Sequence, residues 1–363
     1  MATVSWGSSS SVRRIRTRRT SLAELFARLI KFAKSKLHSP RTRALVAVVL
    51  LFLGLECVVR VVEYGAGSTI SESRSVAACK LPSGSPWRGL HVNSWGYWDS
   101  DFTTEAPEVG IRRVALLGDS SLMAGDAETN VAARLERGID RLEVDHFALP
   151  GMGPREFTAQ FSADVVRRHP EAAFVCLAMT PETENNPSAR PWIEWHTLEL
   201  FSSFAGPAAA HAEAGTPPLQ LEEAVLDYDE FVRVRSPIIA ACRHGEPAAE
   251  FDRRRGEQVA VERLAGECRS AGVRLVLVLV PGEFQLSPQL TAAYCRRQEC
   301  EPAALEIDLP QRRWRAFAEH LGIPTIDLLP ALRESGEVVY LTNSPQWNER
   351  GLEVVAATIG RGI

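Results

Sequence analysis

The stretch that decides the fold is residues 114–121, which read VALLGDSS. Four apolar residues stop at Gly118, and an acid and two serines follow. This pattern predicts a buried β-strand ending in a tight turn, because glycine permits a sharp backbone and Asp and Ser are favoured where a helix begins. Ser120 would then lie at a helix N-terminus, as a nucleophile whose own amide helps to hold an oxyanion. The competing interpretation is an ordinary helix cap.

Four further apolar runs are typical of strands, and segments with helical spacing separate them. The strand candidates are residues 144–149, 174–179, 273–280 and 323–328. The helix candidates are residues 157–168, 250–270 and 310–321. This alternation predicts an α/β fold with a mainly parallel sheet covered by helices on both faces. Reactive groups in such sheets gather at the carboxyl ends of the strands, which favours the nucleophile interpretation of Ser120.

The N-terminal part differs from the rest of the chain in charge and hydropathy. Residues 1–43 carry eleven Arg or Lys against one acid, although the formal net charge of the whole chain is −4. Residues 44–64 are mostly apolar and suit one transmembrane helix, with a core helix as the alternative. The basic tail before this helix predicts a cytoplasmic N-terminus and an extracytoplasmic main domain. Residues 65–85 would form a linker.

Composition narrows the classes of function. The chain has 45% hydrophobic and 24% charged residues, as globular proteins do, and the acidic balance after residue 43 argues against a nucleic-acid partner. Its seven cysteines show no metal-ligand spacing, so we expect no metal and no cofactor. Cys295 and Cys300 bracket a short polar loop and could form a disulfide in an extracytoplasmic domain.

Two motifs in the first half of the domain resemble those of a known enzyme family. Gly-Asp-Ser at residues 118–120, followed by Gly125, resembles the first motif of the SGNH (GDSL-type) hydrolases. Residues 148–153 (ALPGMG) are similar to the second motif, and the resemblance implies that Gly151 supplies an oxyanion-hole amide. Residues 93–97 (NSWGY) resemble the Asn-x-x-Gly segment that precedes the first motif in membrane-anchored members.

The resemblance continues to the C-terminus and covers residues 86–361. Residues 346–351 (QWNERG) have the His-Trp-Asn-x-x-Gly form of the last motif, except at the first position. The third motif, Gly-x-Asn-Asp in the family, is replaced by TPETEN at residues 180–185, so its oxyanion asparagine is either replaced by Thr183 or displaced to Asn185. The family has a three-layer α/β/α sandwich and a serine ester-hydrolase activity, which are therefore the expectations for this chain.

The last motif departs from the family at the residues that activate the serine. Gln346 stands at the position of the catalytic histidine. Asn343 and Ser344 stand at the two possible positions of the catalytic aspartate. Glutamine cannot accept and return a proton near neutral pH, so the usual activation of Ser120 is absent.

Three hypotheses on function remain open. The first is a degraded hydrolase that keeps the pocket and binds an acylated glycan or lipid, with catalysis impaired or lost. The second is an active carbohydrate esterase or O-acyltransferase whose base comes from elsewhere, either His146 in a predicted strand or His196 in an insertion at residues 185–245. That insertion is either a lid or partner surface beside the site or a variable surface excursion. The third is a non-catalytic envelope or exopolysaccharide assembly protein, whose protein partners the sequence does not define.

Overall fold

The computed structural model describes residues 76–77, 79–84, 86–87, 90–102, 106–126, 128–179 and 226–363. The predicted basic tail, the predicted transmembrane helix and residues 185–225 of the predicted insertion lie outside the described residues, as do residues 180–184 before the insertion. Within the described part, no helix has the length and apolar character needed to cross a membrane.

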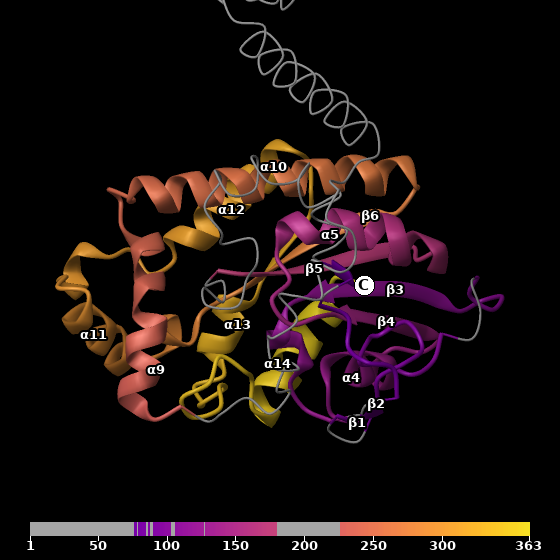
Figure 1. The fold of residues 1–363 in the computed structure, drawn as a ribbon, viewed down its shortest axis with the longest axis horizontal. Coiled ribbons are helices and arrows are strands. Elements are labelled where there is room, and N and C mark those ends of the chain that lie inside the picture. The colour runs from indigo at the N-terminus through magenta and orange to yellow at the C-terminus, as the bar shows by residue number, and fades with distance from the viewer. Residues whose placement is uncertain are drawn as a thin grey trace, which may run out of the picture. The chain divides into compact units, whose positions relative to one another are not determined.

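A five-stranded parallel sheet lies at the centre of the domain (Figure 1). Its strands are β3 (Arg112–Gly118), β4 (Leu142–Ala148), β5 (Ala172–Ala178), β6 (Arg274–Val280) and β7 (Thr325–Asp327). The spatial order is β4-β3-β5-β6-β7, and every neighbouring pair is parallel. All five runs predicted as strands are strands of this sheet. Two short strands, β1 (Pro86–Trp87) and β2 (Leu90–His91), form a separate antiparallel pair.

Helices cover both faces of the sheet, as Figure 1 shows. One layer holds α4 (Val131–Gly138), α13 (Leu328–Glu334) and α14 (Glu349–Gly360). The other holds α5 (Pro154–Gln160), α10 (Ala248–Ser270) and α12 (Leu309–His320). The expected three-layer α/β/α sandwich is therefore confirmed. Of the predicted helices, residues 250–270 and 310–321 match α10 and α12, whereas residues 157–168 continue α5 through a π turn (Phe161–Val165) and a 3₁₀ turn (Val166–Arg168).

The apolar runs that predict the strands are buried because helices cover them on both sides. Leu117 in β3, Val175 in β5 and Leu277 in β6 are fully buried, as expected for strands in the middle of a parallel sheet. Burial of such side chains provides the main driving force for this fold.

A second, smaller core lies beside the sheet. It is built by α9 (Tyr228–Arg235), the 3₁₀ segment Ser236–Cys242 and α11 (Pro288–Arg297). Their apolar side chains pack together around Ile239 and Tyr294. The described end of the predicted insertion is thus helical and belongs to the domain.

Cys295 and Cys300 are both free thiols in the structure. Cys295 is buried within this second core, and Cys300 is partly buried against it. The amide of Cys300 donates to the carbonyl of Cys295 at 3.0 Å. Burial and the neighbouring thiol of Cys300 raise the pKa of Cys295 to about 12. The disulfide suggested by their spacing stays a prediction for an oxidising compartment.

The strand order fixes where a ligand can bind. The chain passes from β3 to β4 on one side and then crosses to β5 on the other side of β3. At such a reversal of direction, the two connections leave a crevice at the carboxyl ends of the strands. The turn that contains Ser120 follows β3, and it therefore lies at this crevice.

Candidate active site

The turn of the predicted nucleophile Ser120, called the nucleophile turn below, is a 3₁₀ helix, Ser120–Met123, that begins one residue after β3. Asp119 caps it, because its carboxylate accepts the amide of Ser121 at 3.0 Å and the hydroxyl of Ser121 at 2.5 Å. At Gly118 a Cβ would lie 2.5 Å from the end of the Leu122 side chain, so a larger residue here would require that side chain to shift. The capping interpretation and the nucleophile interpretation are both compatible with this turn, since Asp119 is the cap and Ser120 is the first residue of the helix.

The predicted oxyanion glycine lies on the neighbouring turn. Gly151 follows β4 and has a φ of 71°, a left-handed conformation that glycine adopts without strain. The amide of Leu149 donates to the carbonyl of Gly118 at 3.2 Å, which joins this turn to the nucleophile turn. The structure therefore brings the first two motifs together at the same edge of the sheet.

The last motif forms a loop between α13 and α14 in which the replaced residues hold the backbone. The side-chain amide of Asn343 donates to the carbonyl of Leu226 at 3.2 Å, and Asn343 itself has a φ of 53°. The hydroxyl of Ser344 accepts the amide of Gln346 at 3.1 Å. Gln346 is 2% exposed. None of the side chains of Asn343, Ser344 and Gln346 can take up a proton from a serine near neutral pH.

The rest of the last motif keeps its structural role. Tyr340 and Trp347 form an antiparallel bridge across the loop. Asn348 caps α14 by accepting the amide of Gly351 at 2.9 Å. The hydroxyl of Tyr340 donates to the carbonyl of Pro281 at 2.5 Å, which ties this loop to the carboxyl end of β6. Burial, followed by the charge of Glu283, raises the pKa of Tyr340.

Of the two histidines considered as replacement bases, the structure describes only His146. His196 lies outside the described residues, as do Thr183 and Asn185. His146 lies in β4 and is 2% exposed, with its Nε2 atom 3.3 Å from the carbonyl of Leu122 and its ring edge-on to Trp98. Burial lowers the pKa of His146 to about 4, which makes it a weak base at neutral pH.

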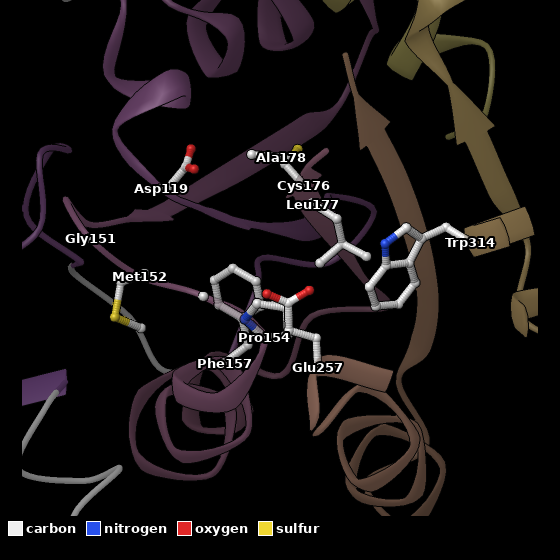
Figure 2. Close-up of a pocket in the computed structure, with 11 residues that line it drawn as sticks. Asp119, Gly151, Met152, Pro154, Phe157, Cys176, Leu177, Ala178, Glu257 and Trp314 are labelled. Carbon is white, nitrogen blue, oxygen red and sulfur yellow. The ribbon is translucent and has the colours of Figure 1, made fainter. Parts of the chain in front are cut away.

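A pocket opens beside the nucleophile turn, and Figure 2 shows the side chains that line it. Asp119 and Gly151 form one end, and the carboxyl end of β5 forms a wall. The space between the atoms amounts to about 460 Å³, part of it open to solvent. Two residues that sequence reasoning missed, Glu257 of α10 and Trp314 of α12, complete the lining. A pocket that combines apolar walls with a few polar groups is typical of a small-molecule site.

A buried charge network lies under the second core. Arg235 of α9 makes a two-pronged ion pair with Glu283, at 3.0 Å and 3.1 Å, and the hydroxyl of Tyr294 donates to Glu283 at 2.8 Å. Burial alone would raise the pKa of Glu283, but Arg235 and these hydrogen bonds hold it below its usual value. Burial also raises the pKa of Asp119, against the opposing hydrogen bonds from Ser121 and the charge of Arg235.

The sequence signal for these additional residues is uneven. Glu283 follows the carboxyl end of β6 in a Pro-Gly-Glu turn, so its position at the edge of the sheet follows from the strand pattern. Arg235, Glu257 and Trp314 lie in helices. In a helical sequence, a polar or aromatic residue of a site cannot be distinguished from one on the surface or in the core. The sequence alone contains no signal that would find them.

Comparison with known proteins shows similarity in structure only. No family model matches the chain, and no curated protein matches it. The chain is similar to a GDSL-like lipase from Bacteroides thetaiotaomicron, with 12% identity, 69% of this chain and 87% of that chain covered, and a TM-score of 0.38. It is also similar to a lipase/acylhydrolase from Enterococcus faecalis, with 12% identity, coverages of 70% and 95%, and a TM-score of 0.38. An acetyl xylan esterase gives 13% identity, coverages of 69% and 99%, and a TM-score of 0.37. Identities and TM-scores this low carry no argument about function, so a function for this chain has to be argued from its own residues.

Proposed function

We propose that this chain is a membrane-anchored SGNH hydrolase-like protein that binds an acylated glycan or lipid and whose ester hydrolysis is impaired or lost. The observation that carries the proposal is the contrast between the two halves of the site. Ser120 and Gly151 follow adjacent strands of a parallel sheet, as a nucleophile and an oxyanion amide require. Asn343, Ser344 and Gln346 stand where the acid and base would be.

Loss of the base has a predictable chemical consequence. A serine hydroxyl is a weak nucleophile until a neighbouring group accepts its proton. Enzymes of this kind that lose the base keep only the contribution of substrate binding and of the oxyanion hole, and kcat falls by orders of magnitude. His146 does not replace the base, because it is buried in β4 and its pKa is low.

Reactivity of Ser120 toward a fluorophosphonate probe tests the proposal, because labelling needs an activated serine oxygen. We expect the full-length chain to label no faster than its Ser120→Ala variant. Rapid labelling that the Ser120→Ala change abolishes would show that a base acts on Ser120 and would overturn the proposed impairment.

Membrane anchoring is a separate part of the proposal and is supported by the sequence of residues 1–64 alone. A basic tail followed by a mostly apolar stretch favours one transmembrane helix with the domain outside the cytoplasm. An alkaline phosphatase fused after Ile363 should therefore be active. Activity of only a cytoplasmic reporter at the same position would contradict this orientation.

A further inference from the structure

Two carboxylates cover the outer edge of β4. This strand ends the sheet on one side, and in the described part of the chain no strand pairs with its outer side. The amide of Val144 donates to Oε1 of Glu136 at 2.8 Å, and the amide of His146 donates to Oδ2 of Asp99 at 2.7 Å. Buried amides at a sheet edge need an acceptor, and an open edge is a template for pairing with another chain. Asp99 and Glu136 therefore take the place of a neighbouring strand, at amides that lie about 7 Å apart along β4.

Asp99 belongs to residues 93–102, which we call the strap. Tyr97 and Phe102 of the strap pack their rings against the ring of Phe147 in β4, with centroids 4.9 Å and 5.3 Å apart. These ring contacts hold the strap against β4. The hydrogen bond to Asp99 fixes the strap to the backbone of the same strand.

His146 links the strap to the nucleophile turn. Its backbone amide donates to Asp99, and its ring lies edge-on to that of Trp98 in the strap, with centroids 5.8 Å apart. On the other side, its Nε2 atom is 3.3 Å from the carbonyl of Leu122, inside the turn Ser120–Met123. A change in the attachment of the strap therefore reaches the nucleophile turn through one residue.

The surroundings of Asp99 favour its neutral form. Asp99 is half-buried and turns its carboxyl group inward onto β4, where the amides of His146 and Ser100 each donate to it at 2.7 Å. These donors are neutral, and the ring of His146 is neutral near pH 7 as well, because burial lowers its pKa to about 4. The charged groups that face Asp99 from β4 and α4 are two acids, Asp145 and Glu136. A negative charge on Asp99 would therefore meet neutral donors and two further negative charges.

The basic side chains of this region pair with other acids. Arg168 donates to Asp145 through two hydrogen bonds at 2.9 Å and 3.0 Å, and Arg113 donates to Glu143 at 3.0 Å. Among the described residues, no basic side chain forms an ion pair with Asp99. Burial, against the opposing bonds from the two amides and with the charge of Asp145 in support, raises the pKa of Asp99 to about 8. Asp99 therefore changes its charge in a pH range where ordinary carboxylates stay charged.

We propose that Asp99 is a latch that joins the strap to the nucleophile turn through His146, and that it opens when its carboxyl group loses its proton. The neutral carboxyl group accepts the amide of His146 without leaving a charge under the strap. When the proton passes to solvent water, a negative charge is left beside Asp145 and Glu136, so an open strap, in which water hydrates the carboxylate, is favoured. The inference goes beyond the proposed function, because it holds whether or not Ser120 is activated.

The latch has a definite direction with pH. Because the closed strap holds the proton of Asp99 more tightly than the open strap does, closure is favoured at low pH and loses this advantage as the pH rises toward 8. Hydrogen exchange on the full-length chain, resolved to single amides by mass spectrometry, measures the opening. We expect protection of the His146 amide, corrected for the intrinsic exchange rate, to fall about tenfold between pH 6.5 and pH 8. Protection of the turn Ser120–Met123 should fall with it.

Substitutions at two positions of the strap separate the latch from a general effect of pH. Asp99→Asn keeps an oxygen acceptor for the amide of His146 and has no proton to lose, so its protection should be the same at both pH values. Asp101→Asn makes the same change at an exposed position of the strap and should behave as the unaltered chain does. Asp99→Ala removes the acceptor and should lower the protection of His146 at both pH values.

The proposal is overturned if protection of His146 in the unaltered chain is the same at pH 6.5 and pH 8, or if Asp99→Asn keeps the full dependence on pH. A loss of protection at His146 that the turn Ser120–Met123 does not share overturns the coupling to that turn. If Asp99→Asn does not fold, Asp99→Ser, which also offers an oxygen acceptor that does not titrate, takes its place. Labelling of Ser120 enters none of these comparisons, so the latch and the proposed function are judged separately.

Discussion

His146 shows how a residue can contact the nucleophile turn and still have a structural role. Its ring lies in a fully packed region between β4 and the nucleophile turn, and its Nε2 atom is 3.3 Å from the carbonyl of Leu122. Burial lowers its pKa to about 4 from the usual value near 6.5. The same burial that prevents it from acting as a base makes the stability of the domain sensitive to acid.

The first prediction concerns this pH dependence. The folded state holds His146 neutral, so it binds fewer protons than the unfolded state below pH 6.5. The stability contributed by His146 is present above pH 6.5 and is lost as the pH falls toward 4, in total about 3 kcal/mol from a shift of some 2.5 pH units. Urea unfolding between pH 7 and pH 4 should therefore show a shallower acid loss for His146→Gln than for the unaltered chain.

His169 provides the matched control for this measurement. It is exposed and has a φ of 51°, a left-handed conformation that asparagine also tolerates. His169→Asn should leave the pH dependence unchanged. An equal acid loss in His146→Gln and in the unaltered chain would show that His146 is not the group that titrates.

At the scale of elements, the retained motif residues are explained by backbone geometry. In the NSWGY segment, the side chain of Asn93 accepts the amides of Trp95 and Tyr97, and Gly96 has a φ of 86°. In the last motif, Asn348 caps α14, and Gly351 lies where a Cβ would be 2.2 Å from the carbonyl oxygen of Val339. These residues build turns that hold the loops of the site, whether or not the site is catalytic.

The second prediction follows from the contact of α14 with Val339. Gly351→Ala should lower the free energy of unfolding by about 1–3 kcal/mol, because the backbone has to move to accept the methyl group. Gly266→Ala, inside α10 with nothing near the new Cβ, should raise it by about 0.5–1 kcal/mol. Chemical denaturation of the two variants checks both signs, and a neutral Gly351→Ala would contradict the close packing described for this loop.

At the scale of the whole molecule, the sequence predicted the sheet well because each strand is a continuous apolar run that helices bury on both faces. The positions of Ser120 and Gly151 were predictable for the same reason, since strand ends are easily recognised. Arg235, Glu257 and Trp314 were not predictable, because they reach the site from helices whose packing is decided by tertiary contacts. His146 lies in a strand, as predicted, but its low pKa follows from its burial, which a sequence shows only indirectly.

The arrangement of the whole domain explains why, in the proposed function, ester hydrolysis depends on a few positions in the last motif. The sheet, the turn of Ser120 and the turn of Gly151 are all formed, and a pocket lined by Asp119 and Gly151 lies beside them. Under the proposed function, the part that this chain lacks is the proton acceptor, because Asn343, Ser344 and Gln346 stand at its positions. Restoring it should restore hydrolysis if nothing else in the site has changed.

The most direct measurement is the hydrolysis of 4-nitrophenyl acetate by the unaltered chain and by two restored variants. One carries Gln346→His with Asn343→Asp, and the other carries Gln346→His with Ser344→Asp. A positioned general base contributes about 10²–10⁴-fold, so we expect one restored variant to gain at least 100-fold in kcat/KM and to lose this gain when Ser120→Ala is added. Turnover by the unaltered chain that already depends on Ser120 and equals that of both restored variants would contradict the loss of the base.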